Sequence, residues 1–152
     1  MSDRIVVMFA GHIHQIGSAQ DIYNRPRTKE VAQFIGRANL FAADVEGRDG
    51  EGYRLRTTFG SVHATSEATD VTIGGKAWLM VRPESIRLSS GMVEGALAAT
   101  VEEAVFLGNL TDYRLRLADG TDVDAQAIGE LAHAPGSAVS VTFDRNRTWL
   151  VR

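Results

Sequence analysis

Two histidines have the spacing most suggestive of metal chemistry in this chain. His12 and His14 lie two positions apart in a stretch that predicts a β-strand. Alternate residues of a strand point to the same face, so both imidazole rings would project together, as in half of a metal site. The sequence offers no evident third ligand, and it contains no cysteine to supply a thiolate. An exposed strand face is therefore the favoured interpretation.

A second conceivable chemistry is acid–base catalysis by paired carboxylates. Asp122 and Asp124 share one face of another predicted strand. A catalytic pair needs a cleft and partners such as a nucleophile or an orienting histidine, and none lies near these residues in the sequence. A solvated surface pair is the favoured interpretation.

Nucleotide hydrolysis requires a glycine-rich loop that holds the phosphates and a carboxylate for magnesium. The pattern GxxxxGK[ST] is absent, and the one Gly-Lys pair, Gly75-Lys76, is followed by Ala77. This pair also lies in a predicted hairpin turn instead of between a strand and a helix. We expect no ATP binding, no catalysis and no cofactor in this chain alone.

Nucleic-acid binding is the third possibility. Four arginines on two similar strands, Arg54, Arg56, Arg114 and Arg116, would form a basic stripe. Single-strand binders also need aromatic side chains among those charges, on which bases stack. Here Tyr53 and Tyr113 would point to the opposite face, and the net charge is −3. Nucleic acid is therefore not an expected partner.

The composition predicts a cytoplasmic domain. The chain has 152 residues, of which 44% are hydrophobic, and this suffices for a core of its own. The longest apolar run, from Ile5 to Ala10, is much shorter than the roughly 18 residues of a membrane span. The lack of cysteine fits a reducing compartment. Any membrane contact is expected to be made through a partner.

The chain opens on two predicted strands, residues 4–8 and 12–16, joined by a turn at Ala10-Gly11. The first is continuously apolar, which is typical of the interior of a parallel sheet with neighbours on both sides. No such neighbours follow in this sequence. We therefore interpret the opening segment as the end of a larger domain.

Two short helices should follow this pair of strands. Ser18 is a predicted N-cap for a helix through Tyr23, and Thr28 caps a second helix. Gly36 is expected to end the second helix in the left-handed conformation. One face of that helix should be apolar and would carry Val31, Phe34 and Ile35.

From Asn39 onward the hydrophobic period changes to two, which predicts a β domain of short antiparallel strands. This region also repeats itself. The stretch 41–46 aligns with 97–102, and Tyr53-Arg54-Leu55-Arg56 recurs as Tyr113-Arg114-Leu115-Arg116. The two copies, about 39–89 and 93–152, should each cover an apolar face that the other cannot bury alone. The predicted fold is mainly β: an OB-like barrel of two repeats, preceded by a hairpin and two helices.

Three stretches in this order carry a resemblance to a known family. They are Ser2 to Met8; Gln15 to Pro26, continuing through Phe34-Ile35-Gly36 to Asn39; and Arg82-Pro83-Glu84-Ser85-Ile86-Arg87-Leu88 with Phe106-Leu107-Gly108. The ordered set resembles the C-terminal part of ATP-binding-cassette (ABC) import ATPases, which ends in a TOBE regulatory domain. The resemblance implies that residues 1–38 close the ATPase core and that residues 39–152 form the TOBE-type domain.

The same resemblance implies the setting of the chain. The parent subunit would bind ATP and magnesium, pair with a second copy of itself and dock on membrane permease subunits at the inner face of the cell membrane. The motifs look closest to importers of polyamines or ferric iron, with sugar importers next. The tail would regulate transport, and a small molecule could be its regulator.

A contact surface is expected at two places. The second repeat has ten residues between Glu102 and Tyr113 where the first has six between Glu46 and Tyr53, and insertions in repeats tend to map to working surfaces. Arg82 and Glu84 flank a rigid proline, which suits a subunit contact. We predict that Arg82, Glu84, Leu107 and Asn109 border this surface. The alternative is a free-standing module that binds a small oxyanion between its repeats.

Overall fold

The computed structural model describes residues 3–68, 70–129 and 132–152. Its first part consists of strands β1 (Ile5–Phe9) and β2 (His12–Gly17) and helices α1 (Ala19–Asn24) and α2 (Lys29–Ile35). The remainder is built almost entirely of strands: β3 (Asn39–Asp49), β4 (Gly52–Thr57), β5 (Gly60–Ala64), β6 (Lys76–Val81), β7 (Ile86–Ser90), β8 (Leu97–Phe106), β9 (Leu110–Leu117), β10 (Asp122–Ile128), β11 (Ala138–Phe143) and β12 (Thr148–Val151). The predicted mainly β class is confirmed.

The first part of the chain follows the local signals in the sequence. Strands β1 and β2 pair antiparallel as a two-stranded sheet. The hydroxyl of Ser18 accepts a hydrogen bond from the N–H of Asp21 at 3.1 Å, and that of Thr28 accepts one from Val31 at 3.3 Å. Both predicted N-caps are therefore confirmed.

Two local expectations were wrong. Gly36 is extended, with φ 175°, and not left-handed. A glycine suits this position because a Cβ would lie only 3.2 Å from the ring of Tyr23. Phe34 is 68% exposed, since the buried side of α2 carries Val31 and Ala32 instead. The Phe34 ring lies perpendicular to the ring of Phe9, with the two ring centres 5.5 Å apart.

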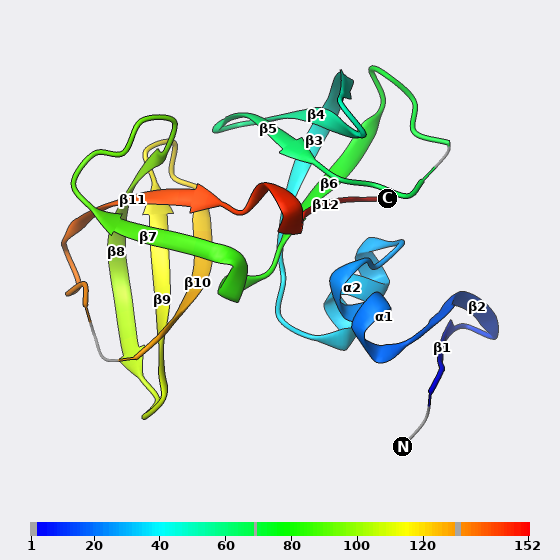
Figure 1. Ribbon diagram of the computed structural model, residues 1–152, viewed down its shortest axis with the longest axis horizontal. Coiled ribbons are helices and arrows are strands. Elements are labelled where there is room, and N and C mark those ends of the chain that lie inside the picture. Colours follow the sequence, from blue (N-terminus) through cyan, green and yellow to red (C-terminus); the bar gives the residue numbers. More distant parts are fainter. Residues whose placement is uncertain (1–2, 69, 130–131) are drawn as a thin grey trace.

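The β region forms two five-stranded antiparallel sheets. The first has the order β12-β6-β3-β4-β5, and the second has the order β10-β9-β8-β11-β7. Figure 1 shows them as two curled lobes, with the second lobe on the left and the helices beneath the first. Strand β7 leaves the first lobe to pair with β11, and β12 leaves the second to pair with β6. Each lobe is thus completed by a strand from the other half of the chain, which gives an OB-like fold of two interlocked halves.

The two sheets use corresponding residues in the same way. Val45 receives a hydrogen bond from Gly74 N–H at 2.7 Å, and Val101 receives the same bond from Gly136 at 2.7 Å. A bulge follows each valine in its strand. Tyr53 and Tyr113 are both buried, with exposed fractions of 3% and 2%.

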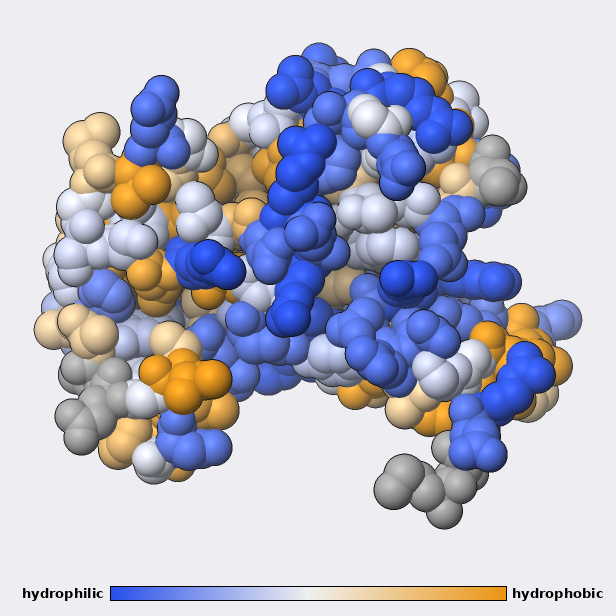
Figure 2. Space-filling view, viewed as in Figure 1, coloured by the Kyte–Doolittle hydropathy of each residue, from blue (hydrophilic) through white to orange (hydrophobic). Residues whose placement is uncertain are grey.

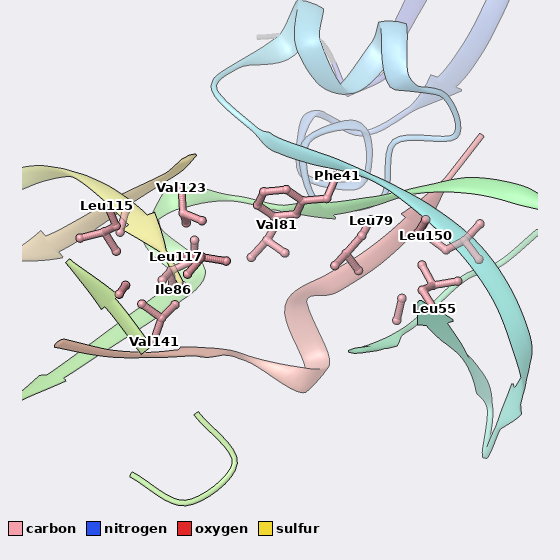
Figure 3. Close-up of a cluster of buried hydrophobic side chains, with 14 of the residues drawn as sticks. Phe41, Leu55, Leu79, Val81, Ile86, Leu115, Leu117, Val123, Val141 and Leu150 are labelled. Carbon is pink, nitrogen blue, oxygen red and sulfur yellow. The ribbon is translucent and has the colours of Figure 1, made fainter. Parts of the chain in front are cut away.

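One hydrophobic core runs through both lobes. In Figure 3, Leu55, Leu79 and Leu150 of the first lobe lie to the right, and residues of the second lobe lie to the left. Phe41 and Val81 lie between the two groups and join them. Because the apolar cluster is continuous, we expect the lobes to unfold together.

Candidate functional site

The clearest polar site is a joint between the two helices and the β lobes. Arg82, at the turn between β6 and β7, is only 3% exposed. Its guanidinium donates to the carbonyl oxygens of Tyr23 at 2.9 and 3.2 Å, of Ala32 at 3.1 Å and of Arg37 at 2.9 Å. These carbonyls lie near the C-terminal ends of α1 and α2, where helices leave carbonyl groups without partners. A cation is also favourable at such ends because of the helix dipole.

Tyr23 and Glu84 complete this joint. The Arg82 guanidinium lies 4.2 Å from the centre of the Tyr23 ring, in a cation–π contact. The Tyr23 hydroxyl donates to the carboxylate of Glu84 at 2.5 Å. Burial, together with the hydrogen bond to Glu84, raises the pKa of Tyr23, so this hydroxyl keeps its proton and remains a donor. Burial also lowers the pKa of Arg82 from its ordinary very high value. The four hydrogen bonds to three carbonyl groups compensate for the free-energy cost of burying this cation.

Asn39 extends the joint to the second lobe. Its side-chain amide donates to the carbonyl oxygens of Val81 at 3.1 Å and of Asp124 at 2.8 Å. Its side-chain oxygen accepts from the N–H of Asp124 at 2.8 Å. Asn39 is buried, so these bonds are shielded from water. The helices, the first lobe through β6 and the second lobe through β10 therefore meet in one hydrogen-bonded network.

The structure separates the four predicted interface residues into two pairs. Arg82 and Glu84 lie together at the joint, where Arg82 is buried and Glu84 is exposed. Leu107 and Asn109 lie at the tip of the β8–β9 hairpin, at the far end of the second lobe (Figure 1). Arg82 is therefore an internal residue, and not a surface residue as the sequence predicted. Whether Glu84, Leu107 and Asn109 contact another molecule remains a prediction.

The extra residues of the second repeat lengthen the β8–β9 hairpin. The pair Val105 with Asp112 corresponds to Asp49 with Gly52 of the first repeat, and the added strand pair is Phe106 with Thr111. Val105, Phe106 and Leu107 are each about half exposed, so the tip is not tucked under the lobe. In Figure 2 orange atoms gather at the lower left, over this end of the second lobe.

The two histidines of the N-terminal hairpin, His12 and His14, have different surroundings. His12 is exposed, and His14 packs edge-on against Phe9 at 4.8 Å. Within the described ranges, no group of three or more His, Cys, Asp or Glu side chains is placed to hold a metal ion.

The predicted arginine stripe and carboxylate pair neutralise each other. Arg116 lies 3.0 Å from Glu102 and 3.5 Å from Asp122, and Arg114 lies 3.5 Å from Asp124. In the first lobe Arg56 lies 3.6 Å from Asp44. Three of the four arginines of the stripe thus form ion pairs on the surface, which reduces the excess positive charge that a nucleic-acid surface would need.

The two-stranded sheet has one buried and one exposed apolar face. Val7 is buried and packs with Ile22 and Val31 of the helices. The opposite face pairs Val6 with Ile16 and Met8 with Ile13 across the strands. These four side chains are 43–58% exposed, and Figure 2 shows orange atoms at the lower right, where the hairpin lies.

A cleft of about 560 Å³ lies between the helices and the first lobe. It is lined by His14 of β2, the α1–α2 linker, the β5–β6 loop, β12 and the residue after it. Several of its charged side chains come from distant parts of the sequence: Arg25, Arg27, Glu67, Asp70 and Arg152. The sequence alone does not indicate this cleft or the role of Asn39. The spacing of these residues carries no signal, because only the fold brings these segments together.

Comparison with known proteins defines the class of protein to which this fold belongs. Residues 79–151 match the TOBE domain family. The match begins in β6 and includes the whole second lobe. The cytoplasmic molybdate-binding protein ModG, solved with molybdate bound, has a similar fold, with a TM-score of 0.65 and 17% identity over 75% of this chain and 96% of ModG.

Similar sequences extend the likeness to the N-terminal hairpin and helices. The spermidine/putrescine import ATP-binding protein PotA of Ruegeria pomeroyi is 40% identical over 150 residues, which cover 94% of this chain and 39% of that protein. PotA 1 of Pseudomonas aeruginosa is 38% identical over 121 residues, covering 80% of this chain and 33% of that protein. The chain is thus a C-terminal, TOBE-containing region of the ABC import ATPase type, and it spans about a third to two-fifths of the length of these relatives.

Proposed function

We propose that this chain is the regulatory C-terminal region of the ATP-binding subunit of an ABC importer. In this proposal residues 1–38 complete the ATPase core, and residues 39–152 form the regulatory domain. The observation that carries it is the exposed apolar face of the β1–β2 hairpin. Contact with the membrane would be made through permease subunits. No helix among the described residues is long and apolar enough to cross a membrane.

The hairpin face is unusual for a free surface. Isolated two-stranded sheets are marginal in water, and contiguous exposed apolar side chains mark contact sites. Burying one aliphatic side chain fully is worth about 1.5–3 kcal/mol, so covering four half-exposed ones would contribute several kcal/mol. The matched region is 33% of one relative and 39% of the other, so most of each relative lies outside it. We infer that the upstream ATPase core of a longer subunit covers this face.

The separate roles of the ATPase core and of this chain follow from that arrangement. ATP and magnesium would bind in the core, and this chain would take no part in catalysis. The joint at Arg82 would transmit rearrangements of the core to the β lobes. Glu84 and the tip residues Leu107 and Asn109 are our candidates for contact with a second copy or a small-molecule regulator. The names of the relatives favour a polyamine as the transported solute, ahead of ferric iron and sugars.

A chimera tests the proposal. This chain would replace the matching 39% of the R. pomeroyi relative, and spermidine uptake would be measured in cells that lack their own importer. We expect uptake, and we expect Val6→Ser with Ile13→Ser in the chimera to reduce it. A matched exposed control is Met92→Ser with Ile73→Ser in the β lobes. A stable, well-expressed chimera without uptake would contradict the proposal.

A second candidate is a free-standing oxyanion-binding module. The likeness in fold to the molybdate-binding protein ModG favours it. It requires that the isolated chain bind molybdate by calorimetric titration without any ATPase core. A flat titration together with a working chimera would decide for the regulatory region.

A further inference from the structure

The cleft of about 560 Å³ has the size of a small-ligand site and an unusual lining. Three arginines line it, Arg25 and Arg27 from the α1–α2 linker and Arg152 directly after β12. Two carboxylates, Glu67 and Asp70, face them from the β5–β6 loop. These five side chains come from three segments that meet only in the folded protein.

The segments on two sides of the cleft, the β5–β6 loop and the α1–α2 linker, are both hydrogen-bonded to the C-terminal stretch of the chain at β12 and Arg152. Thr65 N–H donates to the carbonyl of Thr148 at 2.9 Å and closes the first lobe. Farther along, Lys29 N–H donates to the carbonyl of Arg152 at 3.0 Å. Trp149 lies between these two bonds and forms part of the cleft wall. Leu150 N–H also donates to the Thr65 carbonyl at 2.9 Å, and Arg152 N–H donates to the Arg27 carbonyl at 3.4 Å. The backbone on both sides of the cleft is therefore held by hydrogen bonds.

The arginines are held in place by the carboxylates of the loop. Arg25 lies 2.6 Å from Glu67, and its guanidinium lies 5.9 Å from the centre of the Trp149 ring. Arg152 forms an ion pair with Asp70. All four charged side chains are more than half exposed. Exposed ion pairs of this kind contribute only about 0–1 kcal/mol, so another anion can replace the loop carboxylates at little cost.

We propose that this cleft binds a small oxyanion with two or more charged groups, of the phosphate or carboxylate class. Arg25, Arg27 and Arg152 bind its charged groups, because the planar guanidinium fork matches both chemistries. In the absence of the ligand, Glu67 forms an ion pair with Arg25, and Asp70 forms one with Arg152. The proposal is independent of the ATPase, and it places the ligand outside the β repeats, at the junction with the helices.

A second basic hollow provides a matched control. It is lined by Arg56 and Lys76 of the first lobe, but both of these side chains contact Asp44, at 3.6 and 2.5 Å. Glu46 lines the hollow as well, so two cations face two carboxylates there, whereas in the cleft three guanidinium groups face two carboxylates. We expect no multivalent anion to bind in this hollow.

The experiment is calorimetric titration of the whole chain with pyrophosphate and, separately, citrate at constant ionic strength. We expect saturable binding with one site. Arg25→Ala with Arg27→Ala should weaken binding about tenfold or more, since charged hydrogen bonds are lost. Glu67→Gln with Asp70→Asn should tighten it severalfold by removing the competing carboxylates. Arg56→Ala with Lys76→Ala should leave the affinity unchanged.

The two ligands identify the chemistry. Preference for pyrophosphate assigns the cleft to phosphate compounds, and preference for citrate assigns it to polycarboxylates. Absence of saturable binding to either ligand overturns the proposal, as does binding that depends on Arg56 and Lys76 instead. Melting curves of each variant, expected to match that of the wild type, exclude misfolding as the cause. A failed chimera with intact anion binding would contradict the proposed transport role alone.

Discussion

The side chain of Asn39 pairs with the main chain of Asp124 as a neighbouring strand would. Its oxygen accepts from the Asp124 N–H at 2.8 Å, and its amide group donates to the Asp124 carbonyl at 2.8 Å. The two residues are 85 positions apart in the sequence. The side-chain amide of Asn39 therefore pairs with the main chain of one residue of β10 and links the second lobe to the segment that follows α2.

Replacing Asn39 with Ala should destabilise the protein by about 1–3 kcal/mol, because buried polar groups of Asp124 and Val81 lose their partner. Asn39→Asp should cost at least as much, since a carboxylate cannot donate to the two carbonyl groups. Urea denaturation measures both changes. Asn109→Ala, at an exposed hairpin tip, is the control and should be nearly silent. Equal stability of Asn39→Ala and wild type would refute the role of the amide.

Arg82→Lys should cost about 2–4 kcal/mol, although it preserves the charge. A lysine has one ammonium group and cannot reach the three carbonyls of Tyr23, Ala32 and Arg37 together. The matched control is Arg87→Lys on β7, where the side chain is exposed. Chemical denaturation should show a loss for Arg82→Lys only. If both variants unfold at the same denaturant concentration as wild type, the joint contributes nothing to stability.

Tyr53→Ala and Tyr113→Ala should cost similar amounts, about 3–5 kcal/mol each, because both rings are buried at corresponding positions. Removal of the hydroxyl alone should distinguish them. The Tyr113 hydroxyl accepts a hydrogen bond from the N–H of Ala132 at 3.1 Å. Tyr113→Phe should therefore cost about 0.5–1.5 kcal/mol, and Tyr53→Phe should cost less. If the free energies of unfolding of the two alanine variants differ strongly, the two tyrosines do not contribute equally to stability.

Stability should fall in acid partly through Asp49. A hydrogen bond from His63 at 2.9 Å, with Arg145 nearby, holds the pKa of Asp49 below its ordinary value. A carboxyl with a lowered folded-state pKa stabilises the protein above its unfolded pKa of about 4, and this stabilisation is lost as the pH falls through the folded value. Urea midpoints measured between neutral pH and acid should therefore decline less steeply for Asp49→Asn. An unchanged acid decline would mean that Asp49 does not contribute.

The exposed face of the hairpin should be dispensable for the stability of this chain. Val6→Ser with Ile13→Ser should leave the melting temperature nearly unchanged, because both side chains are about half exposed. Val7→Ser on the opposite face should lower it markedly, since Val7 packs on Ile22 and Val31. Thermal melts compare the two faces directly. A large loss for the first variant would show that the face is already covered within this chain.

The sequence by itself determined the local elements. Oxygen-bearing caps at Ser18 and Thr28 begin the two helices, and alternation of apolar and polar residues places Tyr53 and Tyr113 inside. These signals depend on neighbours within a few residues, which act in the same way wherever the segment finally packs. The resemblance to the TOBE-containing region of import ATPases was also readable, since its motifs keep their order along the chain.

Only the tertiary structure decided which surfaces meet. The exchange of β7 and β12 between the lobes depends on long-range strand pairing, which local periodicity does not encode. Arg82 looked like a surface residue beside a proline, but the C-terminal carbonyls of two helices surround it in the fold. Phe34 fitted an apolar helical face, yet its side chain is left largely exposed once Val31 and Ala32 are buried. Burial and partner choice depend on the free energy of the whole packed assembly, and so they emerge only when distant segments come together.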